Sequence, residues 1–239
     1  MFKPRDYRQW IKNDDLVFFE VREKETDLGI SAERNLEVQA REAVLNYRAE
    51  LERYIEHHPE FFSSLEPVPV REDAPAIVRA MADSAEKVAI GPMAAVAGAV
   101  AEYVAKELMV FSRQVIVENG GDIFLATAGP RILGIYAGER SPFTGKLAIE
   151  LPAAPEGLGV CTSSGTVSHS LSFGGSDAAI IIAESGAMAD AVATATGNIL
   201  KGPGDIARAV EFARSVEGVR GVLALAGETL GSWGEITLV

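Results

Sequence analysis

The chain has 239 residues, of which 48% are hydrophobic and 23% charged, and its formal net charge of −12 gives a sequence pI of about 4.8. This length and composition describe a folded protein with its own core, and the acidic balance without a segregated basic patch excludes nucleic acid as a partner. The single cysteine, Cys161, excludes an intramolecular disulfide and any zinc site built from several thiolates.

The features that report on the cell compartment favour the cytoplasm. The N-terminal region carries charges throughout and lacks the apolar core of a secretion signal. One cysteine fits a reducing compartment. The longest apolar stretch, residues 90–111, is interrupted by Glu102, Lys106 and Glu107, whereas a membrane-spanning helix needs roughly 20 predominantly apolar residues. We therefore expect a buried helix at 90–111 and no membrane partner.

The first elements in the chain are predicted to be two strands and a long helix. Residues 15–32 alternate well enough for two short strands around a charged turn. Residues 35–58 place apolar side chains at helical spacing, with charges on the opposite face, and Pro59 ends the pattern. The apolar positions are Leu36, Ala40, Val44, Tyr47, Leu51, Tyr54 and Ile55. This pattern predicts an amphipathic helix.

A proline-rich connection at 63–75 is the clearest candidate for a boundary, although it is short for an interdomain linker. Asp73 and Pro75 predict the start of another helix, with the proline in the first turn. A further start at Gly91 and Pro92 leads into the apolar helix.

Strands dominate from Arg113 onward. The strand-like segments are 113–118, 122–128, 131–138, 146–152, 157–164, 167–172, 177–184, 221–226 and 235–239. Helices are predicted at 184–198 and 205–216. Strands and helices do not alternate regularly, which favours an α+β class over a doubly wound parallel sheet. We expect a single domain over residues 1–239, helix-rich over about 1–111 and strand-rich over about 112–239.

The first candidate site is the stretch Asn119-Gly120-Gly121-Asp122 between two strand-like segments. Asn-Gly is a strong signal for a tight turn between strands, and a second glycine lets the backbone approach a ligand closely. Taken alone, the stretch is more simply interpreted as a structural turn.

The second candidate is the hydroxyl-rich and glycine-rich segment 161–177, whose side chains and backbone N–H groups are suited to anionic oxygens. It contains His169. A serine hydrolase is disfavoured because no G-x-S-x-G motif is present, and Ser168 and His169 would point to opposite faces of a strand. Cys161 is more simply a small buried hydrophobic residue than a nucleophile.

The other two candidates are helices of small residues. Gly91, Gly98 and the alanines of 90–111 would let a backbone or a flat ligand approach, but they also suit a core or oligomer-interface helix. In the helix at 184–198, Asp190 and Thr194 are four residues apart and share a face, so they could supply two oxygen ligands to a metal. Alternatively, Asp190 lies in the first turn and is stabilised by the helix dipole.

These motifs, in this order and spacing, resemble the ApbE superfamily, whose characterised members are FAD:protein FMN transferases. The family signature runs GG(D/E), then TSG, then ADALATA. Here Gly120, Gly121 and Asp122 match the first motif, and Thr162, Ser163 and Gly165 the second; Asp190 and Thr194 match the aspartate and threonine that ligate Mg²⁺. The resemblance covers roughly residue 91 to the C-terminus. It implies a layered α+β domain in which helices pack on antiparallel or mixed sheets.

Two family segments depart from the pattern. The family helix A-K-G-Y-A-V-D corresponds to residues 96–102, with Ala97 in place of the lysine. The family segment H-I-I-D-P-x-T-G corresponds only to residues 169–174, which begin with His169 but lack the aspartate and proline. These departures affect the parts that handle the substrate and leave the metal pair in place, so the fold is better supported than the activity.

The resemblance implies a Mg²⁺-dependent reaction that splits FAD into FMN and AMP and passes FMN to water or to a protein hydroxyl. It assigns catalytic roles to Asp122 and His169, and the flavin nucleotide to Asn119, Gly120, Gly121, Thr162, Ser163 and Gly165. Mg²⁺ accepts a small set of protein oxygens when a phosphate completes its shell. Two alternatives stay open: a module that binds a flavin or nucleotide without turnover, and an oligomeric scaffold. We also expect Asp122, Thr162, Ser163 and His169 to converge with Asp190 on one cleft.

Overall fold

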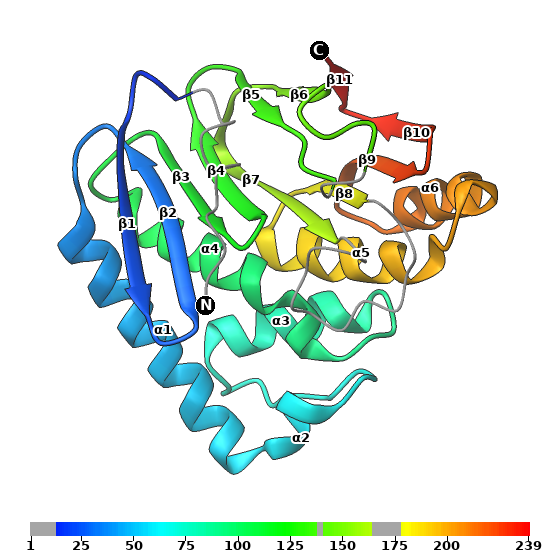
Figure 1. Cartoon of the computed structure of the whole chain (residues 1–239). Coiled ribbons are helices and arrows are strands. Elements are labelled where there is room, and N and C mark those ends of the chain that lie inside the picture. Colours follow the sequence, from blue (N-terminus) through cyan, green and yellow to red (C-terminus); the bar gives the residue numbers. More distant parts are fainter. Residues whose placement is uncertain (1–12, 138–140, 164–177) are drawn as a thin grey trace.

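The computed structural model describes residues 13–137, 141–163 and 178–239 (Figure 1). Within these residues, eight strands form one antiparallel sheet in the order β1-β2-β3-β4-β7-β8-β9-β10. Their bounds are β1 Val17–Glu23, β2 Thr26–Ala32, β3 Val115–Asn119, β4 Asp122–Thr127, β7 Ala154–Ser163, β8 Ala178–Ala183, β9 Val219–Ala226 and β10 Thr229–Gly234. β2 pairs with β3 across a long stretch of sequence, so the helix-rich and strand-rich halves of the chain contribute to the same sheet.

A second, three-stranded antiparallel sheet lies beside the first and has the order β11-β6-β5 within the described residues. Its bounds are β5 Arg131–Gly134, β6 Ala148–Leu151 and β11 Thr237–Leu238. Ile149 and Leu151 of β6 pack against Leu125, Leu158 and other residues of the large sheet in one hydrophobic cluster. The small sheet therefore covers one face of the large sheet.

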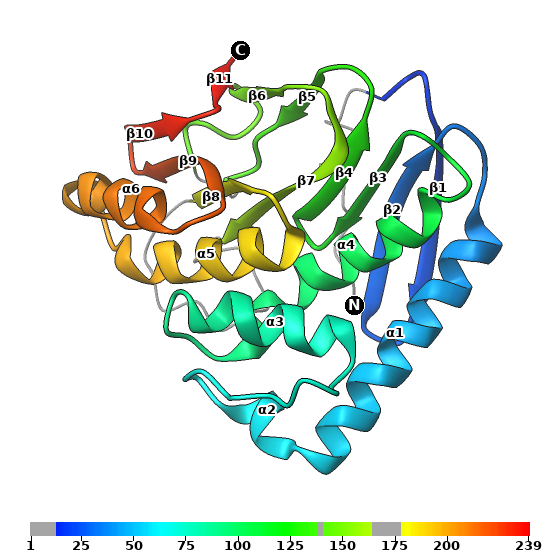
Figure 2. The same ribbon diagram turned by 180° about the vertical axis from the view of Figure 1, so that it is seen from behind.

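Helices cover the opposite face (Figure 2). They are α1 Glu37–His57, α2 Pro59–Ser63, α3 Ala76–Glu86, α4 Val96–Leu108, α5 Gly186–Ile199 and α6 Ile206–Ser215, with 3₁₀ turns η2 Pro92–Ala95 and η3 Pro203–Asp205. The central helices α4 and α5 lie next to each other, and α5 packs on β7 and β8. The arrangement is three layers, with the large sheet in the middle, and it confirms the α+β prediction.

Most predicted elements form where the sequence pattern placed them. The two strands within 15–32 form the hairpin β1–β2, and the amphipathic helix α1 ends just before Pro59. The apolar stretch 90–111 is shorter as a helix than predicted, because it opens with the 3₁₀ turn η2 and α4 ends at Leu108. Across the part of the chain that the structure describes, none of the helices combines the length and the apolar character that crossing a membrane requires.

The C-terminal region differs from the prediction by one strand. Residues 221–239 were expected to contain two strands, but β10 lies between them and pairs with β9 at the edge of the large sheet. Most β10 side chains are exposed and two of its six residues are glycine, so its sequence lacks the buried alternation that marks a strand. The strand predicted at 167–172 lies outside the described residues.

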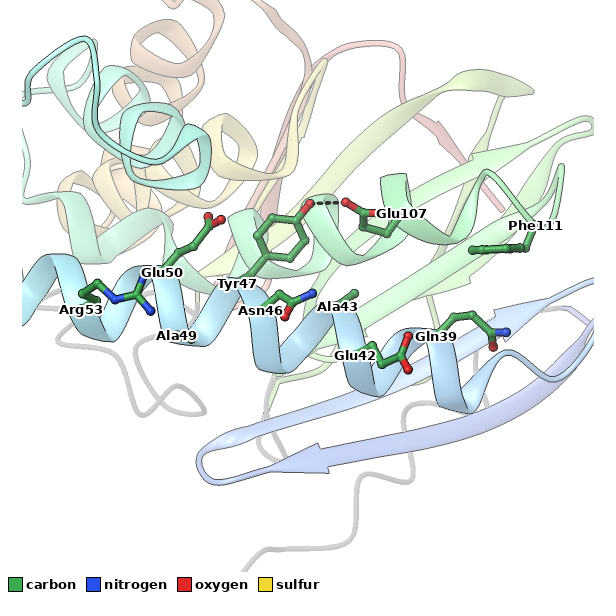
Figure 3. A pocket seen from close by; sticks show the side chains of 10 residues that line it. All are labelled: Gln39, Glu42, Ala43, Asn46, Tyr47, Ala49, Glu50, Arg53, Glu107 and Phe111. Carbon is green, nitrogen blue, oxygen red and sulfur yellow. Dashed lines mark hydrogen bonds between the residues drawn. The ribbon is translucent and has the colours of Figure 1, made fainter.

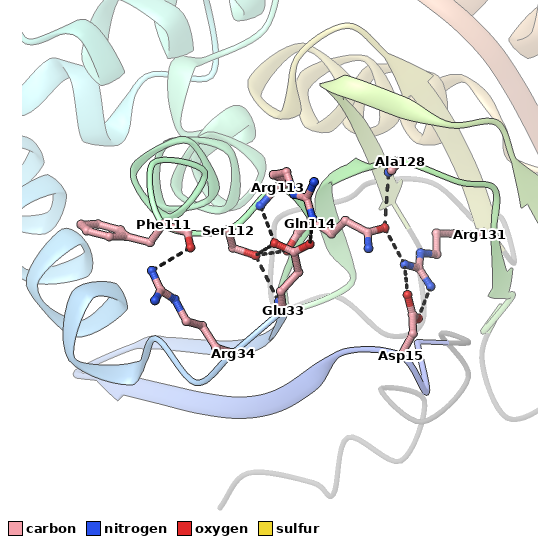
Figure 4. A network of polar contacts seen from close by, with 9 residues as sticks. All are labelled: Asp15, Glu33, Arg34, Phe111, Ser112, Arg113, Gln114, Ala128 and Arg131. Carbon is pink, nitrogen blue, oxygen red and sulfur yellow. Dashed lines mark hydrogen bonds and ion pairs between the residues drawn. The ribbon is translucent and has the colours of Figure 1, made fainter.

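Arg131 of β5 connects the small sheet to the beginning of the large one (Figure 4). Its guanidinium donates to Asp15, just before β1, and to Gln114, just before β3, at 2.8 and 2.9 Å from Nη2. The Gln114 side chain in turn accepts a hydrogen bond from the backbone nitrogen of Ala128 at 3.3 Å. One largely buried cation thus links three segments of the chain.

Candidate functional site

The turn between β3 and β4 brings the predicted Asn-Gly-Gly-Asp stretch against α4. Gly120 and Gly121 have φ angles of 70° and 104°, as a two-residue hairpin turn of the primed type requires, and Asn119 pairs with Asp122 across it. The Asn119 side-chain amide donates to the carbonyl oxygen of Ala97 at 3.1 Å. The predicted turn is therefore confirmed, and it is fixed to the N-terminal part of α4.

Asp122 is the first residue of β4, and its side chain points toward the helices, as does the buried Cys161 of the neighbouring strand β7. Its Oδ1 accepts a hydrogen bond from the backbone nitrogen of Thr162 at 3.2 Å. The carboxyl is buried, with 8% of the residue exposed. Asp122 therefore lies beneath the helix layer, at the end of the hairpin turn.

The position of Asp190 corrects one of the two interpretations of its helix. Helix α5 begins at Gly186, its N-cap is Ser185, and it has no acidic residue in its first turn. The helix dipole acts most strongly on charges in the first turn. Asp190 is the fifth residue of α5 and lies beyond that turn. Ser185 Oγ instead accepts from the backbone nitrogen of Met188 at 3.1 Å and caps the helix. The dipole interpretation of Asp190 is therefore wrong.

Asp190 is held by α4. Its Oδ2 accepts a hydrogen bond from the backbone nitrogen of Gly98 at 2.9 Å. A Cβ atom at Gly98 would lie 2.2 Å from the carbonyl oxygen of Gly186 and 2.7 Å from Cβ of Asp190. Only glycine at this crossing lets α4 approach α5 closely enough for the bond. Gly98 of the apolar stretch thus packs against a neighbouring helix of the same chain, whereas Gly91 packs against Ser64.

Burial raises the pKa values of both aspartates, and like charge adds to the shift of Asp122. Burial raises the pKa of Asp190 to about 7, against the lowering effect of its hydrogen bond from Gly98. Burial, and then the negative charge of Asp190, raise the pKa of Asp122 well above its usual range. The same surroundings raise the pKa of the Cys161 thiol, which keeps it protonated and supports its interpretation as a buried hydrophobic residue. Asp122 and Asp190 are therefore a buried pair of interacting acids.

The other predicted residues fall into three groups. Thr194 lies on α5 one turn after Asp190 and is partly buried, so the two share a helix face. Ser163 is buried at the end of β7 and points toward the helices, whereas the Thr162 side chain points to the opposite face, so only its backbone nitrogen reaches Asp122. Gly165 and His169 lie outside the described residues.

These residues fit Mg²⁺ in chemistry. Two buried carboxylates and a hydroxyl one helical turn away are oxygen donors, which this cation prefers, and a divalent ion would neutralise the like charges of Asp122 and Asp190. Among the described residues, no three or more His, Cys, Asp or Glu side chains are grouped so that they could hold a metal by themselves. A ligand phosphate would therefore have to complete the coordination.

Sequence reasoning missed the contribution of Glu102. This α4 residue is buried, and its Oε2 accepts hydrogen bonds from the backbone nitrogens of Gly186 and Ala187 at 2.8 and 3.3 Å. The first N–H groups of α5 are therefore already occupied by a carboxylate. The signal in the sequence was an acidic residue within an apolar helix, four positions after Gly98.

A separate groove of about 510 Å³ lies between α1 and the end of α4 (Figure 3). Tyr47 and Glu107 face each other across it, joined by a hydrogen bond of 2.7 Å. Its lining includes Glu42 and Glu50, and none of the residues predicted from sequence motifs. The groove is therefore distinct from the aspartate pair.

Comparison with known proteins places the chain among relatives of similar length. A family model described as AbpE bacteria matches residues 8–218. A UPF0280 protein of Methanococcus aeolicus is 42% identical over 202 residues, which cover 82% of this chain and 81% of the relative. A UPF0280 protein of Methanocella arvoryzae is 40% identical over 215 residues, which cover 89% and 86%.

Solved structures agree in fold at much lower identity. The flavinyl transferase ApbE of Pseudomonas stutzeri superposes with a TM-score of 0.58 at 13% identity, covering 92% of this chain and 94% of that one. The ApbE protein of Thermotoga maritima gives 0.55 at 15% identity, covering 90% and 96%. At such identities the likeness shows the fold alone. The chain therefore belongs to the AbpE bacteria family and has an ApbE-like fold.

Proposed function

We propose that the protein is a Mg²⁺-dependent enzyme that cleaves the pyrophosphate of FAD and transfers FMN to water or to a hydroxyl of an acceptor protein. The observation that carries the proposal is the pairing of Asp122 and Asp190, two buried acids from separate elements of the fold. Buried like charges are costly unless they are protonated or lie beside a cation. Support also comes from the solved structures of similar fold, two of which are named flavin or flavinyl transferases.

Different residues would bind the metal and the nucleotide in this reaction. Asp190 and Thr194 would hold the ion from one face of α5. The turn at Asn119, Gly120 and Gly121 would let its backbone approach the nucleotide. Ser163 and Gly165 belong to the second sequence motif, which the resemblance also assigns to nucleotide binding. Bound Mg²⁺ would neutralise the charge that develops on the pyrophosphate and orient the leaving group. The N-terminus of α5 is occupied by Glu102, so the phosphates cannot bind there.

In the chemical step, the hydroxyl oxygen of water or of the acceptor forms a bond to the FMN phosphorus. The bond from that phosphorus to the bridging oxygen breaks, and AMP leaves with the bridging oxygen. We assign Asp122 as the group that accepts the hydroxyl proton, because it is a buried carboxyl at the end of the β3–β4 turn, where the nucleotide would approach. His169 remains the second catalytic residue predicted from the sequence. We place the reaction in the cytoplasm.

The experiment is incubation of the protein with FAD and Mg²⁺, followed by chromatographic measurement of FMN and AMP. Equal amounts of both products, lost on addition of EDTA and in the Asp190→Asn variant, are expected. FAD that remains intact at every Mg²⁺ concentration, both with the protein alone and with a cell extract added as a source of acceptor proteins, would refute the enzymatic function.

A second function, binding of a flavin nucleotide without turnover, is favoured by one observation. Ala97, which stands where the superfamily has a lysine, offers only its carbonyl oxygen to the turn, through the bond from Asn119. Equilibrium binding of FAD and FMN without product formation would support this second function. The oligomeric scaffold stays a prediction, although Gly98 of the apolar helix packs against Gly186 of the same chain.

A further inference from the structure

Helix α4 contacts α5 at two points that are one helical turn apart on each helix. At one point the Gly98 nitrogen donates to Asp190 Oδ2, and at the other Glu102 Oε2 accepts from the nitrogens of Gly186 and Ala187. Gly98 and Glu102 are four residues apart, as are Gly186 and Asp190. Four residues advance a helix by about 6 Å, so the two contacts lie in register along an antiparallel crossing.

Both oxygens of the Glu102 carboxylate have hydrogen-bond partners, Oε2 at the start of α5 and Oε1 within α4 itself. Only 4% of the residue is exposed, and its Oε1 accepts from Lys106 Nζ at 2.6 Å. Lys106 also lies 5.9 Å from the ring centre of Phe124. A buried carboxylate needs such partners, and the N-terminus of α5 provides both N–H donors and the positive end of a dipole.

Two contacts constrain α5 in a way that one contact does not. Helix α5 packs on β7 and β8, and the hydrogen bond between Gly98 and Asp190 joins it to α4 at one point only. The second contact, at the start of α5, fixes the rotation of α5 relative to α4 at a second point. Asp190 and Thr194 share one face of α5, so any rotation of the helix would turn both side chains together.

We propose that Glu102 is a positioning residue that sets the rotation of α5 and thereby directs Asp190 and Thr194 toward the metal. The inference rests on the proposed function, because it assigns the metal to this helix face. Glu102 acts through α5 and does not touch the ligand, since both of its oxygens are occupied within the protein.

The test measures the affinity for Mn²⁺, a spectroscopic substitute for Mg²⁺, by the electron paramagnetic resonance signal of the free ion, with the same concentration of inorganic phosphate in every sample to complete the coordination. The variants are Glu102→Gln, which keeps the shape and one acceptor oxygen, and Glu102→Ala, which keeps neither. Ser185→Ala is the matched control, because it removes another hydrogen bond at the start of α5 without touching α4. Thermal midpoints of all variants are recorded alongside.

We expect the Mn²⁺ dissociation constant to rise roughly tenfold in Glu102→Ala and less in Glu102→Gln, as is typical for residues that orient a metal ligand. Ser185→Ala should lower the thermal midpoint and leave the affinity within about twofold of wild type. In protein labelled with ¹⁵N-glycine, the Gly98 amide resonance should shift in Glu102→Ala and stay in place in Ser185→Ala.

Two results would overturn the inference, and they are distinguishable. If Asp190→Asn weakens Mn²⁺ binding but the Glu102 variants weaken it no more than Ser185→Ala does, Glu102 is only structural and the proposed function stands. If wild type and Asp190→Asn bind Mn²⁺ equally, the metal site is not at this helix face, and the proposed function and the inference fall together.

Discussion

Asp190 is the residue on which the proposed chemistry depends. It is buried, accepts a hydrogen bond from the backbone of another helix, and raises the pKa of Asp122 through its charge. These three properties belong to a functional acid more than to a surface residue, because perturbed acids held by specific partners gather at active sites.

The first prediction concerns the oxygen donors of α5. Asp190→Asn should weaken Mg²⁺-dependent FAD binding by about tenfold or more, equivalent to about 1.4 kcal/mol or more, since the amide keeps the size and loses the charge. Thr194→Val should weaken it less, because it removes only a neutral oxygen. FAD affinity is measured by fluorescence with Mg²⁺ and with EDTA. Unchanged Mg²⁺ dependence in both variants would contradict the metal assignment.

The second prediction concerns the pH dependence of stability without metal. The pKa of Asp190 is about 7 in the folded protein and 3.8 as the reference for an exposed group, so the folded state keeps a proton that the unfolded chain releases in this interval. The proton on Asp190 therefore contributes fully to the free energy of unfolding below pH ~4. This contribution is lost as the pH rises through ~7, at up to about 1.4 kcal/mol per pH unit. The pKa of Asp122 is raised as well, so it acts in the same direction.

The measurement compares wild type with Asp190→Asn in EDTA. The thermal midpoint of wild type minus that of the variant should fall between pH 5 and pH 8, because asparagine does not titrate. Adding Mg²⁺ at pH 8 should raise the wild-type midpoint selectively. Parallel curves for the two proteins across this range would show that Asp190 has an ordinary pKa.

At the scale of elements, the crossing of α4 and α5 decides whether the site can form. Helix α5 packs on β7 and β8 and carries Asp190, whereas the β3–β4 hairpin brings Asp122 and fixes Asn119 to α4. The candidate site thus draws on two helices and a hairpin, and the two helices approach each other closely because Gly98 and Gly186 carry no side chain.

The third prediction tests this close approach with Gly98→Ala. Alanine favours an isolated helix by up to about 1 kcal/mol over glycine, but its Cβ would lie 2.2 Å from the Gly186 carbonyl oxygen. Overpacking of this kind costs about 1–3 kcal/mol, so we expect a net loss of stability and weaker Mg²⁺-dependent FAD binding. The matched control is Gly129→Ala, where the added Cβ would meet no atom within 4 Å. Denaturant unfolding measures the stability of the two variants. A Gly98→Ala protein as stable as the Gly129→Ala control would contradict the prediction, because it would mean that α4 and α5 can move apart at no cost in free energy.

At the scale of the whole molecule, the two sheets and the helix layer are tied together by long-range polar contacts as well as by the core. Glu33, after β2, accepts a hydrogen bond from the Arg113 backbone nitrogen before β3 at 2.9 Å, next to the Arg131 network in Figure 4. The side chain of Arg131 is 10% exposed, whereas that of Asp15 is 53% exposed. Because of this difference in exposure, we expect Arg131 to contribute more to the free energy of unfolding than Asp15 does.

The fourth prediction follows from it. Arg131→Met keeps the length of the side chain and removes its hydrogen bonds to Asp15 and Gln114, so we expect a loss of about 1–3 kcal/mol in the free energy of unfolding. Asp15→Asn should cost less than about 1 kcal/mol, because the Asp15 carboxylate is largely solvated and asparagine keeps an acceptor oxygen for Arg131. Urea denaturation of both variants and of the double variant gives the coupling. Equal losses in the two single variants would contradict this assignment.

The sequence by itself determined the features that depend on neighbouring residues. The Asn-Gly-Gly turn, the helical spacing of Asp190 and Thr194, and the β1–β2 hairpin could all be predicted, because turn chemistry and hydrophobic periodicity act over a few residues. The ordered motifs also predicted the ApbE-like fold. The exposed strand β10 escaped prediction, since it carries no buried alternation.

Only the tertiary structure decided how the site is built. The bond from Gly98 to Asp190 joins residues 92 positions apart, and the bond from Gly186 to Glu102 joins residues 84 positions apart. No local pattern encodes such pairs, because they depend on where two helices cross on a sheet and on how closely their backbones approach. For the same reason the sequence offered a helix-start role for Asp190, whereas the start of α5 is held by Ser185 and Glu102, and Asp190 faces α4, where its charge raises the pKa of the buried Asp122.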